Sequence, residues 1–254
     1  MGIAPNEYRN FYFGTGIEYF FVSQFYLMGY EAYTTNPDIG YDLIVTNQCR
    51  MKYKGAERIN YNIQVKSSIR IKDYTRFYVP VDDFNMLKNN KEAVLICSYH
   101  KPTMQADPCS FVYDRTGDLS MDKAIDEGAM ATFIDNYHNY SIDDAERMFK
   151  FVNFDVQYFW LNSEHLKRLE EEKFFVKYKD SKGRLYMILS VKFVKEEVGE
   201  QFLLVKKDGN DEHSIVPDYM VFEMRSVYYL LNENRSKTEL QEGKLFIYDN
   251  PVYN

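Results

Sequence analysis

Two short apolar segments of this chain each carry polar residues inside a strand-like pattern. The first runs from Gly40 to Val45 with Asp42 near its start, and the second is the segment around Gln64 and Lys66. Because side chains alternate between the two faces of a strand, Gln64 and Lys66 share one face. A carboxylate beside an apolar strand is costly to bury without a partner. The position of Asp42 therefore indicates a functional role rather than a purely structural one.

Asp42, Gln64 and Lys66 together have the chemistry of metal-assisted phosphodiester hydrolysis. Carboxylate and amide carbonyl oxygens are ligands for hard divalent cations such as Mg²⁺. A lysine ammonium beside such a cation can orient a water molecule or help to deprotonate it. The sequence therefore predicts a hydrolytic metal site where the two strands meet.

This arrangement resembles the PD-(D/E)xK nuclease superfamily, which has the restriction-endonuclease-like fold, and within it the branch of archaeal Holliday-junction resolvases. The resemblance covers about Tyr12 to His100. It implies an α/β (α+β) fold with a mixed β-sheet core flanked by helices, in the order helix, three strands, helix, strand. The segments expected to form these elements are Ile17 to Met28, Glu31 to Thr34, the Asp42 strand, the Gln64 strand, Asp82 to Lys88 and Ala93 to Ser98.

The resemblance also implies a role for each candidate residue. Asp42 matches the metal-binding Asp, Gln64 matches the Glu-or-Gln position, and Lys66 matches the catalytic Lys. Glu18 matches the additional helix acid of the resolvase-like branch, and the backbone carbonyl of Val65 is a further expected ligand. Gln64 replaces the commoner Glu, which leaves one less negative charge at the site. The implied cofactor is Mg²⁺ or Mn²⁺, and the implied substrate is DNA, in restriction, defence or junction processing.

Each of these residues also has a structural interpretation. Thr15 to Glu18 fits a capping box, in which Glu18 would return a hydrogen bond to the Thr15 amide. Gln64 and Lys66 fit the solvent face of an edge strand. If the structural interpretations hold, the region is a catalytically inactive module that binds nucleic acid or a protein partner.

Charge along the chain is unevenly distributed. The formal net charge of -7 disfavours a nucleic-acid partner, because phosphate binding draws on Lys and Arg. Basic residues nevertheless predominate from Val45 to Arg76, whereas acidic residues predominate from Val112 to Glu172. The residues expected to contact nucleic acid are Arg50, Lys52, Lys54 and Arg58, in a hairpin or loop around Gly55. An ordinary solvated hairpin has the same appearance.

The length of 254 residues permits a nuclease-like domain over residues 1–140 followed by an α+β module of unknown role over residues 141–254. Lys101 to Pro108 is expected to be a loop, Asp143 to cap a short helix to Phe151, and Ser163 to cap a helix to Lys173. Alternating apolar runs predict strands at Phe174 to Tyr178, Leu185 to Phe193, Phe202 to Val205, Tyr219 to Phe222 and Leu245 to Tyr248.

Other classes of site find little support in the sequence. Cys49, Cys97 and Cys109 form no CxxC pair, and the histidines show no metal-ligand spacing. No apolar span approaches the roughly 20 residues of a membrane helix, and no signal peptide is evident. We therefore expect a cytoplasmic protein without a membrane partner, with a homodimer as an open alternative.

Overall fold

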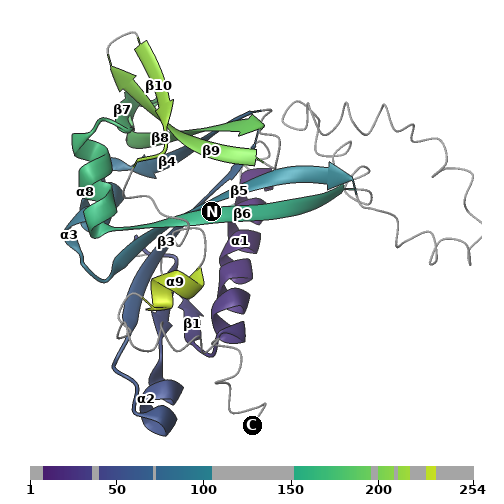
Figure 1. Cartoon of the computed structure of the whole chain (residues 1–254), viewed down its shortest axis with the longest axis vertical. Coiled ribbons are helices and arrows are strands. Elements are labelled where there is room, and N and C mark those ends of the chain that lie inside the picture. The colour runs from purple at the N-terminus through teal and green to yellow at the C-terminus, as the bar shows by residue number, and fades with distance from the viewer. Residues whose placement is uncertain are drawn as a thin grey trace, which may run out of the picture.

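Two β-sheets stand against each other in the computed structural model, which describes residues 8–35, 40–70, 73–104, 152–195, 200–208, 211–217 and 227–232 (Figure 1). The elements are α1 (Tyr8–Leu27), β1 (Glu31–Thr34), β2 (Leu43–Thr46), α2 (Gln48–Lys54), β3 (Asn60–Ile69), β4 (Tyr74–Pro80), α3 (Val81–Asn89), β5 (Ala93–Met104), β6 (Val152–Asn162), α8 (Ser163–Glu171), β7 (Phe175–Lys179), β8 (Leu185–Lys195), β9 (Glu200–Asp208), β10 (Asp211–Ile215) and α9 (Val227–Asn232). The fold is mixed α/β, as expected.

The first sheet has the strand order β1-β2-β3-β5-β6. Its neighbours pair antiparallel except for β3 and β5, which are parallel and are joined by a crossover through β4 and α3. The second sheet has the order β10-β9-β8-β4, and β7 pairs with β8 beside this path. The parallel pair is central, and most of its residues are buried, as parallel strands require.

Helices cover one face of the first sheet, which we call its helix side. Phe21 and Phe25 of α1 are fully buried. The Phe21 ring meets the Tyr158 ring of β6 with centroids 4.8 Å apart, and Phe13 lies 6.0 Å from His100 of β5. Helix α9 lies on the same side, where its Leu230 carbonyl accepts a hydrogen bond of 3.4 Å from the Tyr61 hydroxyl (Figure 1).

The second sheet covers the opposite face of the first, which we call its sheet side. Phe159 of β6 stacks on Phe202 of β9 at 5.5 Å and meets Phe77 of β4 edge-on at 5.8 Å. Tyr99 of β5 lies 4.9 Å from Phe193 of β8. The 23 Tyr and 19 Phe of the chain thus supply much of the packing between the layers.

Several expected elements are confirmed with small shifts. β1 has the expected limits, and α3 extends the expected helix by one residue at each end. β7 is shifted by one residue from the predicted run, and β8 and β9 contain the predicted apolar runs. Helix α8 is capped by Asn162 rather than Ser163, in a capping box completed by His165. The expected strands at Tyr219 and Leu245, and the expected helix after Asp143, lie outside the described residues.

Three local expectations were wrong. Helix α1 begins at Tyr8, so Thr15 and Glu18 lie within it and form no capping box; burial of its aromatic face overrides the two glycines at its centre. The segment before Gly55 is the helix α2, not a hairpin or loop. Strand β5 continues through Pro102, where only β6 pairs with it, so the missing proline N–H breaks no ladder.

Strand pairing crosses the expected boundary at residue 140. Strand β6, from the C-terminal part, completes the first sheet, and β4, from the N-terminal part, is an edge of the second. The two expected units therefore share both sheets. Among the described residues no helix is long and apolar enough to cross a membrane.

Candidate metal centre

Asp42 and Gln64 come together where β2 begins. Leu43 pairs with Ile63, so the residue before β2 lies beside the next residue of β3. The Gln64 amide Nε2 donates a hydrogen bond of 2.7 Å to Asp42 Oδ2, and the Val65 N–H donates one of 2.6 Å to the same oxygen. The structure thus brings together two of the residues that the sequence singled out.

The Gln64 side chain is nearly inaccessible, with 3% of its surface exposed, and its carbonyl oxygen Oε1 is buried without a hydrogen-bond partner. A buried acceptor without a partner costs about 1 to 3 kcal/mol. Apart from a role in packing, an amide oxygen held in this way next to a carboxylate is a ready ligand for a hard cation.

The backbone of β3 directs a further oxygen toward Asp42. The Ile63 carbonyl accepts a hydrogen bond of 2.8 Å from the Asp42 N–H, and the Val65 N–H reaches the Asp42 carboxylate. In an extended strand the N–H and C=O of one residue point to the same side. The Val65 carbonyl therefore faces the β2 side of the strand.

Lys66 follows on the same face of β3 as Gln64. Its neighbour on β5 is Cys97, which is fully buried. Burial raises the pKa of the Cys97 thiol, and the positive charge of Lys66 partly offsets that rise. The half-buried lysine therefore sits over the sheet side of the first sheet, two residues along the strand from Gln64.

The turn before β2 fixes the position of Asp42. Gly40 has φ +87°, and an added Cβ there would lie 2.6 Å from the Met86 methyl carbon of α3. Glycine is favoured here by the positive φ, whereas the flexible Met86 side chain could move away from an added Cβ. The next residue, Tyr41, accepts a hydrogen bond of 2.9 Å at its hydroxyl from Asn90, and its carbonyl accepts one from the Thr35 hydroxyl.

Glu18 lies on a different layer of the molecule. Its helix, α1, packs through Phe13 and Phe21 on the helix side of the first sheet, whereas Gln64 and Lys66 point to the sheet side. Metal ligation by Glu18 remains a prediction.

The four expected nucleic-acid contacts cluster at the far end of β2. Arg50, Lys52 and Lys54 lie on α2, which follows β2, whereas Asp42 precedes it, so about 13 Å of strand separates the two sites (Figure 1). Lys52 and Lys54 are exposed, and α2 buries no residue. Arg50 is half-buried, with its guanidinium 5.4 Å from the centroid of the Tyr30 ring.

Glu31 of β1 anchors α2 to the sheet. Its carboxylate accepts hydrogen bonds from the N–H groups of Gln48 and Cys49, at 2.8 and 2.9 Å, and from the Thr46 hydroxyl at 3.2 Å. Partial burial acts to raise the pKa of Glu31, but the hydrogen bonds from Cys49 and Gln48 outweigh it and hold the pKa below its usual value. At the other end Gly55 ends the helix in the left-handed conformation.

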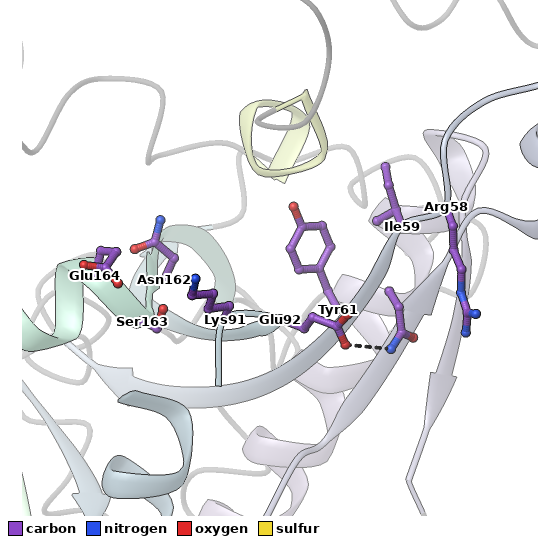
Figure 2. Close-up of a pocket in the computed structure, with 9 residues that line it drawn as sticks. Arg58, Ile59, Tyr61, Lys91, Glu92, Asn162, Ser163 and Glu164 are labelled. Atoms are coloured by element: carbon purple, nitrogen blue, oxygen red, sulfur yellow. Dashed lines mark hydrogen bonds between the residues drawn. The ribbon is translucent and has the colours of Figure 1, made fainter. Parts of the chain in front are cut away.

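Arg58 lines a pocket of about 560 Å³ at the end of the first sheet that lies near α9 and the start of α8 (Figure 2). Tyr61 points toward α9, and among the lining residues the Asn60 amide donates a hydrogen bond of 3.2 Å to the Glu92 carboxylate. Basic and acidic side chains balance in the lining, which consists of Arg58, Ile59, Asn60, Tyr61, Lys91, Glu92, Asn162, Ser163 and Glu164. The pocket therefore shows no electrostatic preference for a polyanion.

His100 is a buried polar residue that the sequence did not single out. It is 1% exposed, and both of its ring nitrogens lack hydrogen-bond partners. Burial lowers its pKa to about 4. The alternation of β5 places it on the helix side, away from Gln64, so it is not part of the candidate metal centre.

No group of three or more His, Cys, Asp or Glu side chains is placed to hold a metal ion within the described ranges. The oxygens near Asp42 that could hold a cation are one carboxylate, one amide oxygen and one backbone carbonyl. Comparisons of the chain with protein-family models, curated proteins and solved structures found no match. The site is therefore interpreted from its own geometry.

Proposed function

We propose that the protein is a divalent-metal-dependent endonuclease that hydrolyses DNA phosphodiester bonds at the Asp42–Gln64 site. The observation that carries the proposal is the buried Gln64 side chain, which contacts Asp42 and keeps an unpartnered carbonyl oxygen. Oxygen donors of this kind fit Mg²⁺ or Mn²⁺. A bound cation would supply Lewis-acid stabilisation of the phosphate charge and acidify a water molecule.

The order of elements supports the restriction-endonuclease-like assignment. Helix α1 is followed by β1, β2 and β3, then α3 and β5, with α2 inserted between β2 and β3 and β4 inserted before α3. In this proposal Asp42, Gln64 and the Val65 carbonyl hold the cation. Lys66 orients the attacking water. As the water oxygen bonds to phosphorus and the bond from phosphorus to the bridging oxygen breaks, Lys66 also stabilises the negative charge that develops.

Cleavage assays test the proposal directly. Plasmid and branched DNA are incubated with the protein and Mg²⁺ or Mn²⁺, with EDTA as the metal-free control. We expect nicking or cutting by the wild type, none with EDTA, and a loss of on the order of 100-fold or more in Lys66→Ala with DNA binding retained. Lys91→Ala, which changes an exposed lysine of the pocket, is the matched control. Equal cleavage by the wild type and Lys66→Ala would contradict the role of Lys66.

A specific observation favours a second candidate function. The Asp42 carboxylate already accepts two internal hydrogen bonds, which would satisfy it in a fold that binds nucleic acid or a protein without cutting. This alternative predicts DNA binding that EDTA does not alter and no cleavage with any divalent cation. Calorimetric titration of Mn²⁺ into the protein distinguishes the two, since only the nuclease proposal predicts saturable binding that Asp42→Ala abolishes.

A further inference from the structure

The outer face of the second sheet carries a cluster of tyrosines. Along β4 and β8 the buried residues, such as Phe77 and Leu189, point toward the first sheet, and the residues between them point outward. Register places Tyr74 opposite Lys192 and Tyr178 opposite Tyr186. We call this surface the tyrosine face; it comprises Tyr74, Arg76, Tyr78, Tyr178, Tyr186 and Lys192.

Three rings of the tyrosine face are neighbours, and two of them are exposed, whereas Tyr74 and Tyr186 are half-buried. Tyr78 is 43% exposed and Tyr178 is 46% exposed. The Tyr78 ring lies 6.3 Å from Tyr178 and 6.2 Å from Tyr186, both edge-to-face, so the rings do not cover one another by parallel stacking. A group of large exposed aromatic side chains on one sheet face marks an interaction surface.

Charge on these strands is of one sign, although the chain as a whole is acidic. Strands β4, β7 and β8 contain no acidic residue. Of their basic residues, Arg76 and Lys192 lie on the tyrosine face, whereas Lys177 and Lys179 pair with Met187 and Leu185 and lie on the other face. The Arg76 guanidinium lies 5.1 Å from the centroid of the Tyr74 ring, so cation and ring share one site.

We propose that the tyrosine face binds single-stranded nucleic acid, with bases stacked on the tyrosine rings and phosphates near Arg76 and Lys192. Aromatic platforms combined with basic side chains bind single strands because every unpaired base offers a π-face. The bases of a duplex are already stacked on one another, so a duplex offers these rings far less. The net charge of the whole chain is -7, yet the charged side chains of this surface are basic. Such a surface attracts a polyanion such as a nucleic acid.

The tyrosine face is separate from the Asp42–Gln64 site but near it. The Thr75 hydroxyl of β4 donates a hydrogen bond of 2.8 Å to Ser68, two residues beyond Lys66 on β3. Four residues of β3, about 13 Å of strand, separate Ser68 from Gln64, and the tyrosine face lies on the opposite side of the second sheet. Binding at the tyrosine face does not depend on the proposed catalysis and is expected to persist in EDTA and in Asp42→Ala.

Fluorescence anisotropy with labelled oligothymidylate and oligouridylate, in EDTA and low salt, tests the proposal. The variants are Tyr78→Leu and Tyr186→Leu, which keep an apolar side chain but remove the ring, and Tyr78→Phe, which keeps the ring. The matched control is Tyr19→Leu, since Tyr19 is 60% exposed on α1. We expect each tyrosine-face leucine variant to bind single strands at least about fivefold more weakly, whereas Tyr78→Phe and Tyr19→Leu match the wild type.

The salt dependence provides a second measurement. Arg76→Ala should reduce the slope of log K against log salt by about 0.7 if Arg76 neutralises one phosphate of a single strand. Comparison of the two oligonucleotides shows whether the strand is DNA or RNA. The proposal is overturned if the wild type binds neither oligonucleotide, or if the leucine variants bind as tightly as the wild type and melt at the same temperature. It is also overturned if the leucine substitutions leave oligonucleotide binding intact but disrupt a complex with another protein.

Discussion

The two sheets of the protein differ in what covers them. The first sheet is enclosed by α1 and α9 on one side and by the second sheet on the other, whereas the second sheet presents the tyrosine face to solvent. Polar residues are ordinary on an exposed face, but inside the first sheet each one requires an explanation. Gln64 donates a hydrogen bond to Asp42, which gives both side chains a polar partner, whereas the ring nitrogens of His100 have no hydrogen-bond partner.

This comparison separates two kinds of candidate site. Inside the first sheet, function is inferred from polar groups that burial makes costly, such as the Gln64 carbonyl oxygen. On the second sheet, function is inferred from aromatic groups that exposure makes unusual, such as Tyr78. If the two sheets differ in this way, substitutions inside the first sheet should change the free energy of unfolding more than substitutions on the tyrosine face.

The largest effect is expected at the contact between the sheets. Phe159→Ala removes a fully buried ring that packs on Phe77 and Phe202, so it should lower the free energy of unfolding by about 3 to 5 kcal/mol. Tyr178→Ala on the tyrosine face should change it by roughly 0.5 kcal/mol or less. Urea unfolding of both variants measures the difference. Similar losses in the two would mean that the tyrosine face is covered in solution.

The next largest effect is a dependence of stability on pH that originates in the first sheet. The pKa of His100 is lowered to about 4 by burial, against 6.5 for an exposed histidine. As the pH falls from 6.5 through 4, the unfolded chain takes up a proton that the folded protein excludes, so stability is lost over that range, by about 3 kcal/mol at most.

Unfolding of His100→Leu as a function of pH checks this expectation. The variant should lose less stability than the wild type between pH 6.5 and 4, because the group that titrates is absent. His213→Leu, which changes an exposed histidine of β10, is the control and should follow the wild type. An identical pH dependence in all three proteins would show that His100 is accessible in solution.

A smaller change of stability is expected at the candidate metal centre. Gln64→Glu replaces the amide that donates to Asp42 by a second carboxylate, which should cost on the order of 2 kcal/mol without a divalent cation. The same charge should tighten Mn²⁺ binding, so Mn²⁺ should raise the melting temperature more in the variant than in the wild type. Weaker Mn²⁺ binding by Gln64→Glu would count against Gln64 as a ligand.

The smallest effect on stability is expected at the exposed helix α2. Glu31→Gln weakens the acceptor that holds the N–H groups of Gln48 and Cys49, at a cost of about 1 kcal/mol or less. Since the pKa of Glu31 is lowered, its contribution is present above the ordinary carboxyl pKa and is lost as the pH falls through the lowered value. Thermal unfolding of wild type and variant at neutral and acidic pH measures both, and equal melting temperatures throughout would contradict the anchoring role.

The basic residues of α2, together with Arg58 which follows the helix, can be tested apart from stability. Neutralising Arg50, Lys52, Lys54 and Arg58 together should weaken binding to duplex DNA and flatten its salt dependence, by about 0.9 in slope for each phosphate that the wild type neutralises and the variant does not. Filter binding at several salt concentrations gives the slope. An unchanged slope would make α2 a solvated surface and leave the tyrosine face as the stronger candidate for nucleic acid.

Part of the first sheet was predicted from the sequence. Alternation placed Gln64 and Lys66 on one face, and the element order that the resemblance implied predicted β1 and the first half of β5. Propensity failed where packing decides. Gly14 and Gly16 disfavour a helix, yet both lie within α1. The edge strand β6 was not predicted, because its partner strand β5 is remote in sequence.

The sequence by itself determined which residues could form a hydrolytic metal site, because strand period and side-chain chemistry are local properties. Tertiary structure decided which of them meet. Pairing of β2 with β3 joins Asp42 to Gln64, while packing of α1 on the opposite side of the sheet puts Glu18 on another layer. Tertiary structure also decided that the tyrosines of β4, β7 and β8 form one surface, because strands far apart in the chain become neighbours only through sheet hydrogen bonds.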